Sequence, residues 1–469
     1  MKKQLLSSFA ISLMVMTSYG QVFTQTQKVT ADDREAEDRM GWSVDMSGDY
    51  AIVGAYGDDF GAVDPNMGSA YIYEKDGDGD WIFAQKIFNS DQDDYDRFGW
   101  SVAINGNLAI IGAYGEDEDE NDENPLAKAG SAYIFERGVD GTWTEVQKIV
   151  ASDRNEGDEF GFSVSIDGDV AVVGAHHCDT DAGGGSYSFH AGAAYIFEFS
   201  GGTWSETAKI DASDRWMNPG FEPGGGEDWN WRFGESVDVS GDYIAIASPF
   251  AGKGYLFEPS GGSWTEVEQL TYPGIADLDR AGAVSISGTT LVLGAQTWDP
   301  SEDAFNAGGA AVFDRVGAGS WSFTTMLEGS DISSGDHFGV SVSISGDYII
   351  AGVHSDNQDE DDAFDLENSG SAFIYKKIAG TWSEYDKIDA ADRTAEDEFG
   401  ISVAISGSTA IVGAFQQDSP VGGGATAEDA GAAYFYLDSE DDDCPTVYSS
   451  QSPSICEGES FTVGASTYT

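Results

Sequence analysis

The chain has 469 residues and a formal net charge of −61, from 83 acidic and 22 basic residues. Nucleic acids and anionic membranes bind through Lys and Arg, so this charge argues against both as partners. A solvated acidic surface that keeps the protein soluble is the simplest explanation of the charge, and three cysteines are too few for a disulfide scaffold.

Residues 1–20 have the three parts of a secretory signal peptide. Lys2 and Lys3 precede an apolar run from Leu5 to Met16, and the small residues Ser18 and Gly20 follow it. This run is too short to span a bilayer, and no later stretch is long and apolar enough to do so. We therefore expect the mature protein to be secreted, either extracellular or at the cell surface.

A phrase close to FGxSVxISG recurs seven times, first at 40–48 and last at 399–407. Each copy is followed by a tight turn, an apolar run such as YAIVGAY, a variable loop, and two further runs such as GSAYIFE and TWTEVQKIV. The runs alternate apolar and polar residues, which predicts four strands per unit. Seven units of about 60 residues predict an all-β fold, a seven-bladed β-propeller at 21–438.

The two ends of the repeat array complement each other. Units one to six finish with a tryptophan strand, whereas the seventh stops after residues 431–438. Residues 22–34, VFTQTQKVTADDR, match TWTEVQKIVASDR at 142–154, with Phe23 in the place of Trp143. We therefore expect an N-terminal strand to close the ring as the outer strand of the seventh blade, which removes free sheet edges.

A different composition follows the propeller. Residues 439–455 form an acidic, Ser- and Pro-containing linker, and 456–469 begin a new alternating pattern, which predicts the start of a further, truncated β-rich segment. The chain would then be part of a longer multidomain protein. Cys444 and Cys456 could pair with each other, which leaves Cys178 over.

FGxSV followed by IVGA resembles the FG-GAP repeat, the unit of the integrin α-subunit propeller and of many secreted bacterial proteins. The resemblance covers residues 22–438 and implies an extracellular propeller used in adhesion or recognition. Two features depart from the family pattern. The proline of GAP survives only within 247–249, and the integrin-type calcium loop is replaced by a bare turn such as 47–49. That turn is too short to supply six to eight oxygens, so the chain is similar to a bacterial subfamily without that calcium site.

Alternating strands place the loops that enter each blade and the loops between second and third strands on one face, called here the loop face. The entry loops carry two recurring aspartates within SDRxxxDxFG, the upstream ones including Asp33, Asp91, Asp153, Asp331 and Asp392. They hydrogen-bond to loop amides or pair with arginines such as Arg34, Arg154 and Arg393, or else they join the acidic loops in holding Ca²⁺. The candidate calcium ligands are Asp96, Asp158, Asp336, Asp397, Asp117, Asp119, Asp359 and Asp361.

Two segments break the sevenfold repetition, and they contain the candidate ligand-binding residues. One is the loop HHCDTDAGGGSYSFH of blade three, which carries His176, His177 and His190. A transition-metal site is chemically possible there, although the spacing matches no known signature. The other is the entry to blade four, which carries Trp216, Phe221, Trp229 and Trp231. These aromatic residues either contact a sugar or a protein partner or pack as a plug.

No GxSxG elbow, HExxH, phosphate-binding glycine loop or CxxC pair is present in the sequence, and we nominate no catalytic residue. We expect a non-catalytic adhesion or recognition module whose acidic loop face binds an extracellular protein or polysaccharide. The alternative is a polysaccharide-binding or polysaccharide-cleaving propeller that uses the loops of blades three and four.

Overall fold

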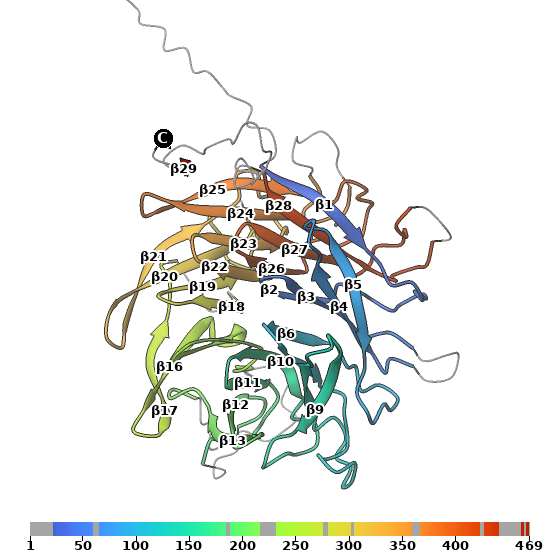
Figure 1. Cartoon of the computed structure of the whole chain (residues 1–469). Helices are drawn as coiled ribbons and strands as arrows, with labels where there is room; N and C mark the ends of the chain where they lie inside the picture. Colours follow the sequence, from blue (N-terminus) through green and yellow to red (C-terminus); the bar gives the residue numbers. More distant parts are fainter. Residues whose placement is uncertain are drawn as a thin grey trace, which may run out of the picture.

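The computed structural model describes residues 22–59, 65–183, 188–215, 231–274, 280–301, 304–358, 366–422, 426–439, 461–463 and 466–468. Within these ranges the chain forms seven four-stranded antiparallel sheets arranged around a central axis (Figure 1). The predicted all-β, seven-bladed propeller is therefore confirmed. No helix in the described part of the chain has the length and apolarity of a membrane span.

Blades are numbered along the chain, and each lists its strands from the axis outward. Blade 1 has β2 (Ser43–Ser47), β3 (Tyr50–Ala55), β4 (Ser69–Lys75) and β5 (Trp81–Ile87). Blade 2 has β6 (Ser101–Asn105), β7 (Leu108–Ala113), β8 (Ser131–Arg137) and β9 (Trp143–Ile149). Blade 3 has β10 (Phe160–Asp167), β11 (Val170–Ala175), β12 (Ala193–Ser200) and β13 (Thr203–Ile210). Blade 4 has β14 (Ser236–Ser240), β15 (Tyr243–Ser248), the short 3₁₀ turn η1 (Pro249–Ala251), β16 (Lys253–Ser260) and β17 (Ser263–Leu270).

Blade 5 has β18 (Ala281–Ser287), β19 (Thr290–Ala295), β20 (Gly309–Gly317) and β21 (Ser320–Leu327). Blade 6 has β22 (Val342–Ser345), β23 (Tyr348–Val353), β24 (Ser371–Ile378) and β25 (Thr381–Ile388). Blade 7 combines β26 (Ser402–Ser406), β27 (Thr409–Ala414) and β28 (Ala432–Asp438) with the N-terminal strand β1 (Phe23–Val29).

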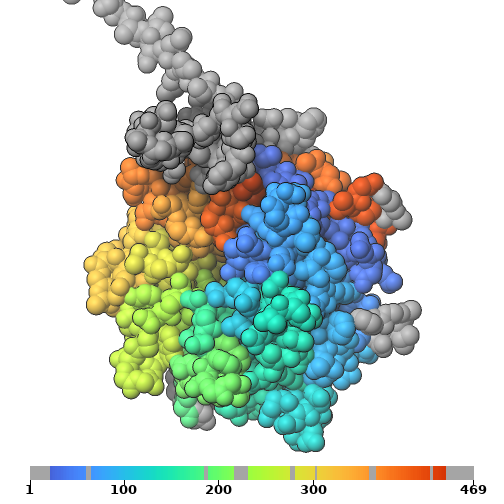
Figure 2. Space-filling model, in the orientation of Figure 1, coloured from blue at the N-terminus to red at the C-terminus, as the bar shows by residue number. Residues whose placement is uncertain are grey.

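The ring closes through β1, as the sequence predicts. Strand β1 pairs antiparallel with β28, from Phe23 opposite Asp438 to Val29 opposite Ala433. The innermost strand of each blade contacts that of the next, and β26 returns to β2. In the space-filling view, the blue N-terminal segment lies directly against the red C-terminal one (Figure 2). No sheet among the seven blades is left without its outer strand.

The recurring FG pair is explained by packing between blades. Phe98 is fully buried between blades 1 and 2. Gly99 follows it at φ +86°, and a Cβ added there would lie 2.2 Å from the carbonyl oxygen of Ser69. A side chain at this position would collide with backbone that cannot move aside. The motif therefore marks the contact at which one blade docks on its predecessor.

Seven hydrophobic clusters lie between neighbouring blades, so the core is distributed around the ring. Serines of the innermost strands add hydrogen bonds from blade to blade. Ser43 Oγ donates to the Gly99 carbonyl (2.9 Å) and Ser101 Oγ to that of Gly161 (2.9 Å). Each blade therefore fixes the position of the next at the axis.

Beyond the propeller, β29 (Phe461–Val463) and β30 (Ser466–Tyr468) pair antiparallel with each other. The expected signal peptide, residues 440–455 of the expected linker, and Cys444 and Cys456 lie outside the described residues. Cys178 is a buried free thiol in blade 3. The extent of a second domain stays a prediction.

Candidate binding site around the propeller axis

The loop face is held together by backbone hydrogen bonds between consecutive blades. The loop that enters a blade donates to the loop between the second and third strands of the preceding blade. Phe98 N bonds to Met67 O at 2.9 Å, and at the closure Met40 N bonds to Ala430 O at 3.1 Å. The two loop types therefore lie on one face, and residues flanking the strand ends are held in fixed places.

Three positions in each blade meet around the axis on this face: the residue before the FG pair, the residue after it, and the residue that follows the second strand. We call these residues the axial ring. They are Arg39, Trp42 and Tyr56; Arg97, Trp100 and Tyr114; Glu159, Phe162 and His176; Arg232, Glu235 and Pro249; Arg280 and Gln296; His337, Val340 and His354; and Glu398, Ile401 and Phe415. Blade 5 supplies two residues because its entry is one residue shorter.

Aromatic side chains of blades 7, 1, 2 and 3 form a continuous arc within the axial ring, called here the aromatic arc. The rings of Trp42 and Phe415 lie 5.0 Å apart between centroids, those of Trp42 and Trp100 4.6 Å, and those of Trp100 and Phe162 5.5 Å. Tyr56 lies edge-on to both tryptophans. Trp42, Trp100 and Phe162 are half-buried, so the arc presents aromatic surface to solvent while its rings hold one another in place.

Arginines and histidines occupy several of the ring positions that are not aromatic, and Glu159, Glu235 and Glu398 occupy three others. The Arg97 guanidinium lies 5.0 Å from the Tyr114 ring centre, and those of Arg232 and Arg280 lie 4.9 Å and 4.8 Å from that of Phe250, which directly follows Pro249. These are cation–π distances. The axial ring thus carries four arginines and three glutamates in a chain of net charge −61.

All five histidines of the chain belong to this region. The His176 ring lies tilted against His177 at a centroid distance of 3.9 Å, His177 stacks on His190 at 4.1 Å, and His337 stacks on His354 at 5.7 Å. Burial holds the pKa of His176 well below its usual value and lowers the pKa of His190 and of His354 to about 4. These three imidazoles are therefore neutral at physiological pH.

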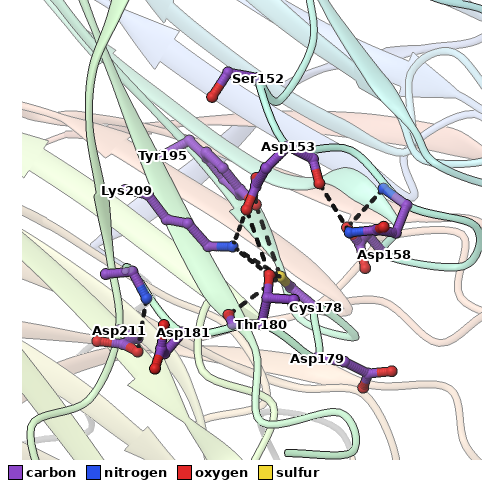
Figure 3. Close-up of polar contacts among 12 residues, drawn as sticks. Ser152, Asp153, Asp158, Cys178, Asp179, Thr180, Asp181, Tyr195, Lys209 and Asp211 are labelled. Atoms are coloured by element: carbon purple, nitrogen blue, oxygen red, sulfur yellow. Dashed lines mark hydrogen bonds and ion pairs between the residues drawn. The ribbon is translucent and has the colours of Figure 1, made fainter. Parts of the chain in front are cut away.

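The upstream aspartates of the entry loops form ion pairs with lysines of the outer strands. In blade 3, Lys209 Nζ lies 2.7 Å from Asp153 Oδ2 and 3.3 Å from Cys178 Sγ, and the Tyr195 hydroxyl donates to Asp153 Oδ1 at 2.8 Å (Figure 3). The same arrangement recurs with an acid in the place of Cys178, as in Lys86 with Asp33 and Asp58, Lys148 with Asp91 and Glu116, and Lys387 with Asp331 and Asp356.

The predicted pairing of these aspartates with arginines is wrong. Arg34 and Arg154 donate instead to backbone carbonyls of neighbouring loops, and Arg393 pairs with Asp389. The lysine reaches the aspartate because it lies on the outer strand of the blade that the loop enters. In blade 5, partly buried Trp298 and Met326 replace the charged cluster by apolar contact.

The downstream aspartates, four of them predicted calcium ligands, accept hydrogen bonds from amides of their own loops. Asp96 Oδ2 accepts from Asp93 N at 2.7 Å and Asp158 Oδ2 from Asn155 N at 3.0 Å. Asp336 and Asp397 make the same contact. Burial raises the pKa of Asp96 to about 8 and that of the other three to about 6. Calcium binding by these groups stays a prediction.

The remaining predicted residues order their own loops, pack between blades, or lie outside the described ranges. Asp117 accepts from Lys128 N at 2.6 Å, and Asp119 from the backbone amides of Asn121 and Glu123, so both order their own loop. Trp231 packs, partly buried, against the cluster between blades 3 and 4. Asp359, Asp361, Trp216, Phe221 and Trp229 lie outside the described residues.

The sequence interpretation missed the axial ring, apart from His176. The axial ring can be found in the sequence by position relative to the FG pair, not by residue type. The position before the FG pair, for example, is Arg, Arg, Glu, Arg, Arg, His and Glu in blades 1 to 7. The comparison of blades in register brings these unlike residues into one set.

Comparison with known proteins agrees with this architecture. The family model described as FG-GAP repeat matches residues 23–73, 81–135, 143–197, 321–375 and 382–436. A search of curated proteins gave no match. Among solved structures, that of U3-55K is similar with a TM-score of 0.50 and 11% identity, covering 89% of this chain and 100% of that one. The crystal structure of the RRP9 WD40 repeats is similar with a TM-score of 0.50 and 10% identity, covering 88% and 99%. At this identity the two structures support the fold alone.

Proposed function

Because the chain belongs to the FG-GAP repeat family, we propose that it is a secreted or cell-surface recognition module that binds an extracellular protein or polysaccharide through its loop face, without catalysis. FG-GAP repeats are typical of extracellular and cell-surface proteins. The sequence features of residues 1–20 support export to that compartment.

The observation that carries the proposal is the aromatic arc with its flanking arginines. Packing requires the FG phenylalanines and the glycines that follow them, and these positions repeat. The axial ring does not repeat, although it lies on the same frame. The half-buried Trp and Arg side chains here pack against the buried Tyr56 and Tyr114. Trp, Tyr and Arg dominate binding energy in interfaces, and loops on a rigid scaffold are where binding residues concentrate.

The acidic loops surround this centre and give the proposed interface its rim. Charged rims exclude competing partners and affect the association rate more than the affinity. We therefore assign the affinity to the aromatic arc and arginines, and partner discrimination to the loops. The alternative polysaccharide site at the entry to blade 4 stays a prediction, since most of its aromatic residues lie outside the described ranges.

The test is a screen of the full chain against arrays of glycans and extracellular proteins, with and without Ca²⁺. Any bound partner is then measured against the variants Trp100→Ala and Arg97→Ala. We expect each to weaken binding by about 2 kcal/mol or more, as hot-spot residues do. The control is Val139→Ser in the hairpin between β8 and β9, on the opposite face, where the side chain is fully exposed.

Melting temperatures of all variants distinguish lost contacts from lost folding. Unchanged affinity in both ring variants, together with weaker binding in Val139→Ser, would place the interface on the opposite face and contradict the proposal.

A further inference from the structure

Three potential metal ligands converge in blade 3. Glu159 Oε2 lies 3.4 Å from His176 Nε2 and 3.0 Å from His177 Nδ1, and all three ligand atoms lie within 4.8 Å of one another. Within the described ranges this is the one such group of His, Cys, Asp and Glu. Glu159 immediately precedes β10 and the two histidines immediately follow β11, so antiparallel pairing of Phe160 with Ala175 brings them together. The group thus rests on strand ends rather than on the long loop.

Packing fixes the two imidazole rings in place. His176 is 2% exposed, and Phe162 lies against it at a centroid distance of 3.8 Å. His177 lies between His176, whose ring is tilted against it, and His190, on which it stacks. The ring nitrogens that face away from Glu159, His176 Nδ1 and His177 Nε2, are buried and have no hydrogen-bond partner among the described residues. The polar contacts of both imidazoles therefore converge on one carboxylate oxygen.

The two distances from the Glu159 carboxylate to the histidine nitrogens are compatible with tetrahedral coordination. Zn²⁺ bonds of about 2.0–2.1 Å to nitrogen and about 2.0–2.2 Å to oxygen place neighbouring ligand atoms about 3.3 Å apart. The two observed distances, 3.0 Å and 3.4 Å, lie on either side of this value. Imidazole suits borderline transition metals, whereas Ca²⁺ and Mg²⁺ prefer oxygen ligands.

We propose that Glu159, His176 and His177 bind a divalent transition-metal ion, for which Zn²⁺ is the reference. Two histidines and one carboxylate leave a fourth position for water or for a group from a partner. The site does not depend on the recognition function proposed above, since metal binding can be measured without any partner.

The charges around the group permit a cation. Glu159 contributes one negative charge. The neighbouring guanidinium of Arg232 faces Glu235, with Nη1 3.5 Å from Oε2, so a carboxylate offsets the nearest positive charge.

Blade 6 offers a control built into the same chain. His337 and His354 occupy the ring positions that Glu159 and His176 occupy in blade 3. Their rings stack, but blade 6 has histidine in the place of the carboxylate and Ser355 in the place of His177. A variant of His354 therefore removes an equivalent axial imidazole without changing the proposed ligands.

The experiment uses the full chain with Cys444→Ser and Cys456→Ser, so that no thiol of the C-terminal segment competes for Zn²⁺. Zn²⁺ is titrated in competition with a chromogenic chelator, and Co²⁺ absorption reports coordination geometry. We expect one equivalent of metal. His177→Ala and Glu159→Gln should each weaken Zn²⁺ binding by more than the roughly 10–100-fold that loss of an outer-shell partner costs. His354→Asn should leave it unchanged.

Melting curves without metal establish that each variant folds. His177 is the preferred target because its side chain is 19% exposed, against 2% for His176. The proposal is overturned if the parent protein binds no stoichiometric Zn²⁺, if Glu159→Gln and His177→Ala bind it as tightly as the parent, or if His354→Asn weakens binding equally.

Discussion

Gln27 and the backbone of Trp81 exchange two hydrogen bonds across the closure of the ring. Gln27 Nε2 donates to Trp81 O at 2.8 Å, and Trp81 N donates to Gln27 Oε1 at 3.2 Å. Gln85 makes the same exchange with Trp143, and Gln147 with Trp204. The junction made by the N-terminal strand is therefore chemically the same as two junctions inside the array.

The first prediction follows from this equivalence. Gln27→Ala and Gln85→Ala should destabilise the propeller equally, by about 1 kcal/mol for each hydrogen bond lost. Urea denaturation of both variants measures the two free energies of unfolding. A much smaller loss for Gln27→Ala would mean that the closure frays before the rest of the ring unfolds.

The second prediction concerns Phe23, which is fully buried and lies edge to face with Tyr348 at a centroid distance of 5.9 Å. Phe23→Ala should cost about 3–5 kcal/mol. Deletion of residues 22–30 should unfold the propeller or cause aggregation through the bare edge of β28. The matched control is Ile82→Ala on β5, where the side chain is 49% exposed and we expect a change within about 0.5 kcal/mol. A deletion variant that melts within a few degrees of the parent would contradict the closure.

The third prediction tests the lysine clusters. Lys148 is 6% exposed at its side chain and pairs with Asp91 and Glu116. Lys148→Met leaves both carboxylates buried without their cation, so it should destabilise the protein by about 3–5 kcal/mol. Thermal unfolding measures the loss, with exposed Lys128→Met as the control. Equal melting temperatures for the two variants would show that the buried pairs contribute nothing.

The fourth prediction is a dependence of stability on pH. Burial raises the pKa of Asp38 to about 7 and that of Asp96 to about 8, whereas aspartates in an unfolded chain titrate near 3.9. The folded state therefore binds more protons in this range, and its stability falls as pH rises through about 7 to 8. The lowered pKa of His190 and His354 acts oppositely, because stability falls as pH drops below about 6.5.

The melting temperature in EDTA should thus be higher at about pH 6.5 than at about pH 8.5, at matched ionic strength. Asp96→Asn keeps the acceptor oxygen but cannot ionise, so it should flatten this slope. Asp76→Asn, in the exposed hairpin between β4 and β5, should not. A melting temperature that rises between these two pH values would refute the assignment.

The fifth prediction addresses calcium. If the aspartates of the loop face bind Ca²⁺ with a dissociation constant near 10⁻⁴ M, about 1 mM Ca²⁺ should stabilise the fold by roughly 1.4 kcal/mol per site. Melting curves in Ca²⁺ and in EDTA at equal ionic strength measure this. Identical melting curves in Ca²⁺ and in EDTA would leave solubility as the explanation of the large negative charge of the chain.

The blades and the closure could be predicted from the sequence because every blade uses the same strand pattern and the same packing contacts with its neighbour. Phe23 could be placed because it stands five residues before a lysine, as Trp143 does. The lysine clusters were missed because Asp153 is one residue from Arg154 in sequence, whereas Lys209 meets it only after blade 3 has formed. The histidine group was recognised in part, but Glu159 was not, because it reaches His177 only through the pairing of β10 with β11.

The ends of the propeller leave it side by side. Ser439 N donates to Val22 O at 2.8 Å, next to the pair of Phe23 with Asp438. Tension applied to both ends would act on this pair first. It would then break the hydrogen bonds between β1 and β28 one after another, beginning at Phe23 and Asp438. The six blades that contain no chain end would bear no load until β1 had separated from β28. The site around the axis would therefore be disturbed only after blade 7 had lost its outer strand.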